Sequence, residues 1–256
     1  MKEKELIESL ARQAGETLMK HFRQDWSLLK ERGAAKEVAT RYDKEVDSLV
    51  IAEIKRHYPR HSLLTEESGS LQGDPAWLWI VDSLDGTGNF ANFNPLFSVC
   101  IALMHEGELL LGAVYAPAIG EFYFAEKGQG AYLNNVKLQV SDVSDLGQSY
   151  MLYCEGGDRN KGRTCELLHE VYPHVIDIRK LGSAGLETAW VAAAKREAYF
   201  TTRIEPWDVA PGVLLVQEAG GRVSDFQGNP WQALTSDLLF SNDKLHEKIL
   251  GLLSAQ

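Results

Sequence analysis

The stretch WIVDSLDGTGNF, residues 79–90, places two aspartates where an apolar run ends and a glycine-rich turn begins. Asp82 closes the apolar run, and Asp85 follows three residues later, directly before Gly86 and Thr87. Carboxylates at the end of a buried strand cost free energy unless they gain partners. Glycine lets the backbone approach an anion closely, and backbone amides at a helix start bind phosphate oxygens. The stretch therefore predicts a strand, a phosphate-binding turn at Gly86 and Thr87, and a helix start.

Three further segments bring acidic residues to comparable positions. Glu66 and Glu67 follow the apolar pair in LLTEESG, Asp208 follows a tryptophan in EPWDVAPG, and Asp43 ends the segment TRYD. These segments contain no histidine or cysteine, and an all-oxygen ligand set favours Mg²⁺ or Mn²⁺ over zinc. If the carboxylates converge, they create a site for hard divalent cations.

The spacing of Asp82 and Asp85 suits a pair of cations. A tight turn can aim both side chains and the Leu84 carbonyl at neighbouring metal ions, which is the arrangement that two-metal phosphoryl chemistry requires. The spacing is equally compatible with an ordinary Asp-Gly turn and a helix cap, and Glu66 with a solvated strand end. On the residues alone, both interpretations stay open.

Apolar periodicity in the first half indicates helices followed by strands. A first helix is expected from about Glu5 to Phe22, a loop over Trp26–Lys36, and a second helix after Thr40. Asp43 is expected near the N-terminal turn of that second helix, where the helix dipole favours negative charge. The short apolar runs that follow indicate strands, with a hairpin turn in HEGE, residues 105–108.

The second half predicts helices over ETAWVAAAKREA and VAPGVLLVQEAGG, and a last helix from about Asp243 to Leu253. Strands are expected at AYFT, RVSDF and LLFSN. No repeat or linker-like segment separates the two halves of the sequence. We therefore expect a layered α/β (α+β) arrangement with mixed sheets between helices.

Composition restricts the classes of partner. The 256 residues carry a formal net charge of −10, so no overall positive field attracts nucleic acid or anionic lipid. The N-terminus is charged and no apolar run reaches 18 residues, which predicts a cytoplasmic protein without a membrane partner. The three cysteines lack paired spacing, as is typical of reduced thiols. An anionic substrate would need local neutralisation, which a bound metal supplies.

Taken together, the motifs resemble the inositol monophosphatase family across nearly the whole chain. The matching elements are TxxD at Thr40–Asp43, the GEE element as TEES at Thr65–Ser68, DPxDGTxNF at Asp82–Phe90, WDxAxG at Trp207–Gly212 and EAGG at Glu218–Gly221. The resemblance implies an α-β-α-β-α sandwich of the sugar phosphatase type, formed by a single domain over residues 1–256. Two packed halves are expected, approximately residues 1–145 and 146–256, and the family tendency implies a homodimer.

The same resemblance implies roles for single residues. Asp43, together with Glu66, would orient a water, and Thr87 would hold the attacking water and the phosphate, which makes these three the expected catalytic residues. The implied mechanism is in-line attack on phosphorus by a metal-activated water. Two or three Mg²⁺ or Mn²⁺ ions would be held by Glu66, Asp82, the Leu84 carbonyl, Asp85 and Asp208. The substrate is expected to contact Asp85, Gly86, Thr87, Arg179, Gly182, Ser183, Thr201, Arg203 and Asp208.

Departures from the family pattern concern the substrate. Ser83 replaces the usual proline, which loosens the turn without removing a ligand. Thr201 stands where the animal enzymes have a glutamate that binds inositol hydroxyls, which argues against strict inositol specificity. The neighbouring segments resemble the subgroup of archaea and thermophilic bacteria that combines inositol monophosphatase with fructose-1,6-bisphosphatase activity. Arg179, Lys180 and Arg203 are then candidates for binding a second phosphate, or are ordinary solvated residues.

The leading functional hypothesis is a Mg²⁺-dependent phosphatase that hydrolyses small phosphorylated polyols or sugars, such as inositol 1-phosphate and fructose 1,6-bisphosphate. One alternative is a nucleotide-type phosphatase for 3′-phosphoadenosine 5′-phosphate or NADP, although no adenine-stacking motif is recognisable. Another is a non-catalytic binding role, although the acidic balance disfavours direct RNA binding.

Overall fold

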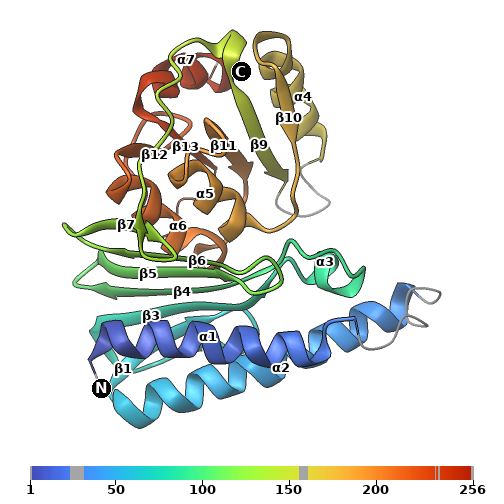
Figure 1. Cartoon of the computed structure of the whole chain (residues 1–256). Helices are drawn as coiled ribbons and strands as arrows, with labels where there is room; N and C mark the ends of the chain where they lie inside the picture. Colours follow the sequence, from blue (N-terminus) through green and yellow to red (C-terminus); the bar gives the residue numbers. More distant parts are fainter. Residues whose placement is uncertain (1, 24–31, 156–160, 234, 236, 255–256) are drawn as a thin grey trace.

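Helix pairs and β-sheets alternate in five layers (Figure 1). This computed structural model describes residues 2–23, 32–155, 161–233, 235 and 237–254. From the first layer to the last, the helix pairs are α1 (Glu3–His21) with α2 (Arg32–His57), α5 (Ala184–Ala192) with α6 (Pro206–Glu218), and α4 (Lys161–Val171) with α7 (Asp243–Leu253). A sheet lies between each pair and the next, so the expected α-β-α-β-α sandwich is confirmed.

The sheet between the first two helix layers has eight strands and is almost entirely antiparallel. Only β1 and β3 pair in parallel among its strands. The predicted hairpin in HEGE joins β4 to β5, with positive φ at Glu106 and Gly107. In spatial order the strands are β2 (Gly69–Leu71), β1 (His61–Thr65), β3 (Asp74–Asp85), β4 (Ser98–His105), β5 (Glu108–Ala116), β6 (Glu121–Glu126), β7 (Gly130–Leu133) and β8 (Val136–Lys137).

The second sheet has five strands of mixed direction. Strand β9 pairs in parallel with both its neighbours, and β13 pairs antiparallel with both of its own. In spatial order the strands are β10 (Asp177–Arg179), β9 (Tyr150–Glu155), β11 (Ala198–Thr202), β13 (Leu238–Asn242) and β12 (Gly221–Asp225). The remaining helical pieces are α3 (Thr87–Ala91), η2 (Leu146–Gln148) and η4 (Tyr172–His174).

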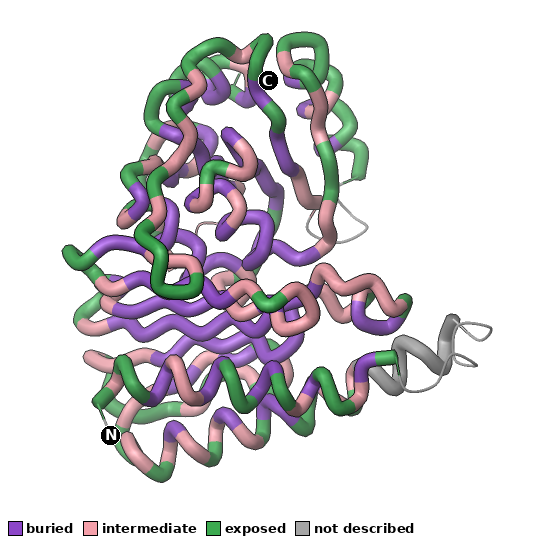
Figure 2. The backbone as a smooth tube through the Cα atoms, viewed as in Figure 1, coloured by how far each residue is buried: buried purple, intermediate pink, exposed green. Residues whose placement is uncertain are grey.

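Three apolar clusters fill the interfaces between the layers, and the buried segments of Figure 2 follow the strands of the first sheet and the helices above it. Helix α6 is packed from both sides, with buried residues from Val209 to Val216. A helix between two sheets must be apolar around its whole circumference, which explains the unbroken run VAPGVLLV. None of the described helices is both long and apolar enough to cross a membrane.

Helix α2 begins earlier than the sequence pattern predicts. It starts at Arg32, so residues 32–36 of the expected loop are helical, whereas residues 26–31 lie outside the described part of the chain. Apolar periodicity predicts where a helix starts, and the segment RGAAKEVATR has little of it. The predicted start therefore falls after Thr40. Asp43 therefore lies in the middle of the helix, and the expectation that the helix dipole favours its charge is wrong.

Candidate active site

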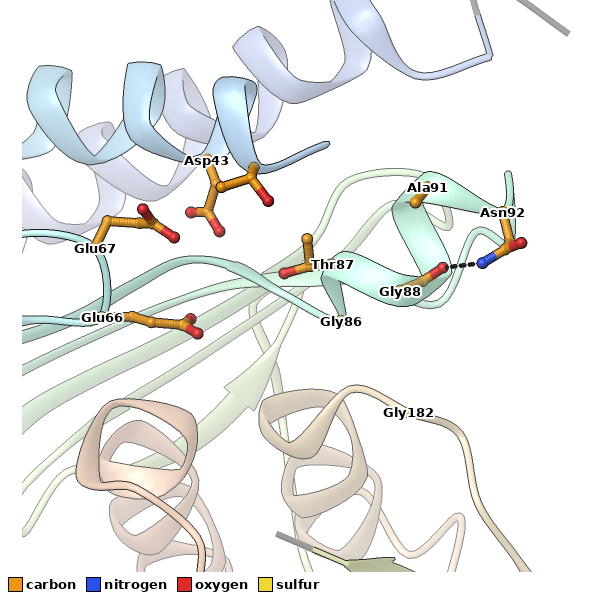
Figure 3. Close-up of a pocket in the computed structure, with 10 residues that line it drawn as sticks. Asp43, Glu66, Glu67, Gly86, Thr87, Gly88, Ala91, Asn92 and Gly182 are labelled. Atoms are coloured by element: carbon orange, nitrogen blue, oxygen red, sulfur yellow. Dashed lines mark hydrogen bonds between the residues drawn. The ribbon is translucent and has the colours of Figure 1, made fainter. Parts of the chain in front are cut away.

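A cavity of about 660 Å³ opens where α2, the end of β1 and the turn between β3 and α3 meet (Figure 3). The side chains of Asp43, Glu66 and Glu67 lie together on one side of it, and Thr87 lies opposite Asp43. Its lining consists of Thr40, Asp43, Glu66, Glu67, Gly86, Thr87, Gly88, Ala91, Asn92 and Gly182. We call this the acidic cavity, because none of these lining residues is basic.

A second cavity of about 700 Å³ adjoins the first and shares Gly88, Asn92 and Gly182 with it. We call it the distal cavity. Charges of both signs line it. They belong to Asp85, Asp208, Glu155, Glu205, Lys180 and Arg203.

Strand pairing explains how Glu66 and Asp82 come together. Strands β1 and β3 run parallel with Thr65 opposite Val81, so Glu66, which follows β1, lies beside Asp82, the next residue of β3. The amide of Glu66 donates to the Val81 carbonyl at 3.2 Å, which extends this pairing past the end of β1. The two strands therefore bring two carboxylates together.

Asp208 reaches the same point from the other half of the chain. It is the third residue of α6 and accepts a hydrogen bond from the Glu205 amide at 3.2 Å, as half of a capping box. Carboxylate oxygens of Glu66, Asp82 and Asp208 all lie within 4.8 Å of one another. The structure thus brings three of the five predicted metal ligands into a single cluster.

Burial and mutual repulsion raise the pKa of these carboxyl groups. The pKa of Asp82 lies well above its ordinary value because the group is buried, and because Asp85, Glu66 and Asp208 add negative charge. The pKa of Asp43 is raised to about 8, first by burial and then by the charge of Glu66. Such a cluster is costly when ionised unless a cation neutralises it.

Two buried oxygens support a cation at this position. Among the described residues, neither Asp43 Oδ1 nor Asp82 Oδ2 has a hydrogen-bond partner, although both side chains are nearly inaccessible. A buried carboxylate oxygen normally has a partner. Unpartnered carboxylate oxygens in an all-oxygen cluster fit a hard divalent cation such as Mg²⁺ or Mn²⁺.

The turn between β3 and α3 is held by its own side chains. Asp82 Oδ1 accepts the Leu84 amide at 2.9 Å, and Thr87 Oγ1 donates to the Leu84 carbonyl at 3.1 Å. Gly86 has φ of +87°, and a Cβ there would stand 3.0 Å from the Gly182 carbonyl, so glycine is required. The prediction that the Leu84 carbonyl is a metal ligand stays a prediction.

Asp85 joins the two halves of the chain. Its carboxylate accepts hydrogen bonds from the Ser98 hydroxyl at 2.8 Å, the Ser183 hydroxyl at 2.5 Å, and the amides of Ala184 and Gly185 at 2.9 Å each. It therefore caps the N-terminus of α5. Burial raises the pKa of Asp85, and these four bonds oppose that shift. One oxygen accepts a single bond and keeps a lone pair for a ligand.

Several of the predicted substrate contacts lie away from the two cavities or already have hydrogen-bond partners, and they stay predictions. Thr201 has no exposed side-chain surface, and Arg179 donates to Asp177 at 2.7 Å within the edge strand β10. Neither is among the described residues that line the two cavities. Ser183 is 1% exposed and bonds Asp85, and the Gly182 amide donates to Glu187 at 3.2 Å. The Gly182 amide is therefore already bonded, although Gly182 itself lines both cavities.

Other residues of the predicted substrate site line the cavities. Gly86 and Thr87 line the acidic cavity, whereas Asp85, Arg203 and Asp208 line the distal one. Lys180 also lines the distal cavity and pairs with Glu155 at 2.5 Å.

Asp47 was missed at the sequence level. It lies one turn beyond Asp43 in α2, is 1% exposed, and accepts hydrogen bonds from Ser68 at 2.5 Å and Ser83 at 3.5 Å. It therefore connects α2 to the segments that carry Glu66 and Asp82. Its spacing of four residues from Asp43 was the available signal, since such residues share a helix face.

Comparison with known proteins agrees with this geometry. The model of the inositol monophosphatase family matches residues 2–256. The chain belongs to the inositol monophosphatase family. One relative, the fructose-1,6-bisphosphatase/inositol-1-monophosphatase of Thermotoga maritima, is 35% identical over 96% of this chain and 93% of its own length. The family resemblance inferred from the motifs is thus confirmed.

Two further matches widen the comparison. The Nus factor SuhB of Escherichia coli K12 is 34% identical over 94% of this chain and 91% of its own length. The structure of an inositol monophosphatase from Anabaena superposes with a TM-score of 0.85 at 33% identity, covering 97% of this chain and 94% of that one. As a member of this metal-dependent family, the chain is a phosphoric monoester hydrolase.

Proposed function

We propose that this protein is a Mg²⁺-dependent phosphatase that hydrolyses small phosphorylated polyols or sugars, with inositol 1-phosphate and fructose 1,6-bisphosphate among its substrates. The observation that carries the proposal is the cluster of Glu66, Asp82 and Asp208, whose oxygens lie within 4.8 Å of one another. The cluster borders a turn at Gly86 and Thr87 that leaves room for a phosphate.

Bound Mg²⁺ would supply neutralisation of the phosphate charge and activation of water at neutral pH. Glu66, Asp82, Asp85 and Asp208 would hold these ions, with the Leu84 carbonyl as a further oxygen ligand. Asp43 and Glu66 line the same cavity, where they would orient the attacking water and accept its proton. Thr87 lines that cavity too and is held against the Leu84 carbonyl, so it is placed to contact the phosphate.

The distal cavity supports acceptance of a second phosphate. The sugar or polyol that leaves the hydrolysed phosphate would extend from the acidic cavity past Gly88 and Gly182, which line both cavities. Lys180 and Arg203 line the distal cavity. Their ammonium and guanidinium groups are of the kind that binds phosphate oxygens in proteins. A bisphosphate therefore meets opposite charge at both ends, through the metal site and through these side chains.

A substrate panel tests the proposal. Purified protein would be assayed for phosphate release from inositol 1-phosphate, fructose 1,6-bisphosphate, 3′-phosphoadenosine 5′-phosphate and NADP, with Mg²⁺ and with EDTA in excess. We expect turnover of the first two substrates with Mg²⁺, and none with EDTA. Preferred hydrolysis of the nucleotides would favour the nucleotide-type alternative, and turnover in EDTA would contradict a metal-dependent reaction.

A non-catalytic binding role is the second candidate, since a relative of 34% identity carries the name of a Nus factor. An Asp82→Asn variant separates the two in cells that lack the protein. Restoration of the wild-type phenotype by this variant would favour binding, and failure would favour hydrolysis. A cytoplasmic location, a homodimer and the absence of a nucleic-acid partner remain predictions of the sequence.

A further inference from the structure

Glu187 is a buried carboxyl group that the proposed reaction does not use. It lies in the first turn of α5, has no exposed surface, and is enclosed by the central helix layer. Its Oε1 accepts two backbone amides, from Leu181 at 2.6 Å and from Gly182 at 3.2 Å. Burying an acid costs free energy, so a buried glutamate with two bonds to one loop indicates a specific role for that loop.

The Leu181–Gly182 segment is held from two sides. Glu187 binds its amides, and Asn89 Nδ2 donates to the Leu181 carbonyl at 2.7 Å. Asn89 belongs to α3, next to the phosphate-binding turn, and also donates to the Leu96 carbonyl at 2.5 Å. Because the carbonyl of Leu181 and the amide of Gly182 are both hydrogen-bonded, the position of this peptide relative to the turn between β3 and α3 is fixed.

Residues of this segment line the two cavities. Gly182 lines both cavities, and Lys180, two residues earlier, lines the distal one. The Gly182 carbonyl lies 3.0 Å from the point where a Cβ on Gly86 would stand, so the segment packs closely against the turn. Ser183, the next residue, bonds Asp85.

We infer that Glu187 is a positioning residue that holds segment 180–183 in place. It thereby determines how well the leaving group of the substrate, its sugar or polyol, fits the site. The inference rests on the proposed function for its link to substrate and deepens it, because it assigns specificity to a residue that touches neither substrate nor metal. It predicts that loss of Glu187 raises KM for substrates that fill the distal cavity more than it lowers kcat.

The carboxyl group serves this role as an acceptor. Burial raises the pKa of Glu187 to about 8, and the two backbone amides oppose this shift. Among the described residues its second oxygen has no partner, whereas Oε1 has two. Glutamine keeps an oxygen at the Oε1 position and has the same size, so it should substitute for glutamate, whereas leucine should not.

Amide exchange and kinetics together test the inference on Glu187→Gln and Glu187→Leu. Hydrogen exchange of the Leu181 and Gly182 amides should accelerate at least about tenfold in Glu187→Leu and stay within about threefold of wild type in Glu187→Gln, since only leucine removes the acceptor. KM for fructose 1,6-bisphosphate should rise about tenfold in Glu187→Leu, while kcat/KM for phenyl phosphate, which lacks a second phosphate, changes less than about threefold.

Glu197 provides the matched control. It is also buried, at 7% exposure, and accepts one backbone amide, that of Tyr150 at 2.7 Å, but it lines neither cavity among the described residues. Glu197→Leu should lower the free energy of unfolding without changing exchange at 181–182 or KM. An equal rise in KM in this variant, or unchanged exchange in Glu187→Leu, would overturn the inference.

Two further outcomes are decisive. If Glu187→Leu does not fold, Glu187→Asp replaces it, because the shorter side chain loses reach to both amides, and the same exchange comparison applies. If the wild type hydrolyses no phosphate ester, the proposed function fails, while the exchange of the Leu181 and Gly182 amides still shows whether Glu187 positions the segment.

Discussion

The two adjoining cavities differ in the segments that provide their lining residues and in the charges of those residues. The acidic cavity takes Asp43 from α2 and Glu66 and Glu67 from the end of β1, and none of its lining residues in the described part of the chain is basic. The distal cavity mixes acids with Lys180 and Arg203, which come from loops far apart in the sequence. We infer that carboxylates from both cavities provide the chemistry, whereas Lys180 and Arg203 in the distal cavity select the substrate.

Removing a ligand from the cluster should have the largest effect. Asp208→Asn should lower kcat at least about a hundredfold, because a lost carboxylate weakens a cation that supplies several kcal/mol of transition-state stabilisation. Circular dichroism should show an unchanged fold. Asp177→Asn is the control, since Asp177 pairs with Arg179 away from both cavities, and near-normal turnover of Asp208→Asn at saturating Mg²⁺ would remove Asp208 from the ligand set.

A change in the distal cavity should act on one class of substrate only. Arg203→Ala should lower kcat/KM for fructose 1,6-bisphosphate about tenfold, because one charge-assisted hydrogen bond to an exposed phosphate is lost. The value for inositol 1-phosphate should change less than about threefold. Arg179→Ala is the matched control and should alter neither, so an equal loss for both substrates in Arg203→Ala would assign Arg203 to the shared chemistry instead.

The metal-free protein should become less stable as pH rises. Asp43 has an ordinary pKa of 3.8 and a folded pKa of about 8, so the folded state holds a proton that the unfolded chain releases. Stability from this group is complete below about pH 4 and is lost as pH rises toward 8, with each pKa unit worth about 1.4 kcal/mol.

Urea unfolding in EDTA at about pH 5 and about pH 8 measures this loss, which we expect to be at least about 1 kcal/mol. Adding Mg²⁺ should remove most of the difference, because a bound cation favours the ionised carboxylates. Greater stability at pH 8 than at pH 5 in EDTA would show that the cluster is not strained by its charge.

The smallest effect is expected at Thr201. Its hydroxyl is buried, and in the described part of the chain its oxygen has no partner, so Thr201→Val should keep kcat/KM for both substrates within about twofold. Stability should stay equal or rise slightly. A change of more than tenfold in the preference between inositol 1-phosphate and fructose 1,6-bisphosphate would restore the original interpretation of this position.

The carboxylate motifs could be predicted from the sequence because their geometry is local. Asp82 and Asp85 lie within one turn, and Asp208 lies in the first turn of a helix that its own capping box starts. Motifs of this kind specify backbone and side chain together. The layered fold could be predicted from the apolar periodicity of the sequence. This includes the last helix, which runs over Asp243–Leu253 as expected.

The positions of side chains relative to segments far away in the sequence could not be predicted. Arg179 and Lys180 are neighbours in sequence, yet Arg179 pairs outward with Asp177 and Lys180 lines the distal cavity, because side chains alternate along an extended strand end. Likewise, the sequence predicts that Gly182 contacts the substrate, whereas the structure shows its amide donating to Glu187. Such pairings depend on tertiary contacts that a single sequence does not display.

Calorimetric titration of Mg²⁺ into metal-free protein tests most directly whether the buried carboxylate cluster is a metal site. We expect the wild type to bind at least two Mg²⁺ ions and to release protons, because carboxyl groups with a raised pKa must ionise to bind the cation. Asp82→Asn should bind at least about tenfold more weakly, and Asp177→Asn should match the wild type. Wild-type protein that binds no Mg²⁺, or binds it as tightly after Asp82→Asn as before, would contradict the account.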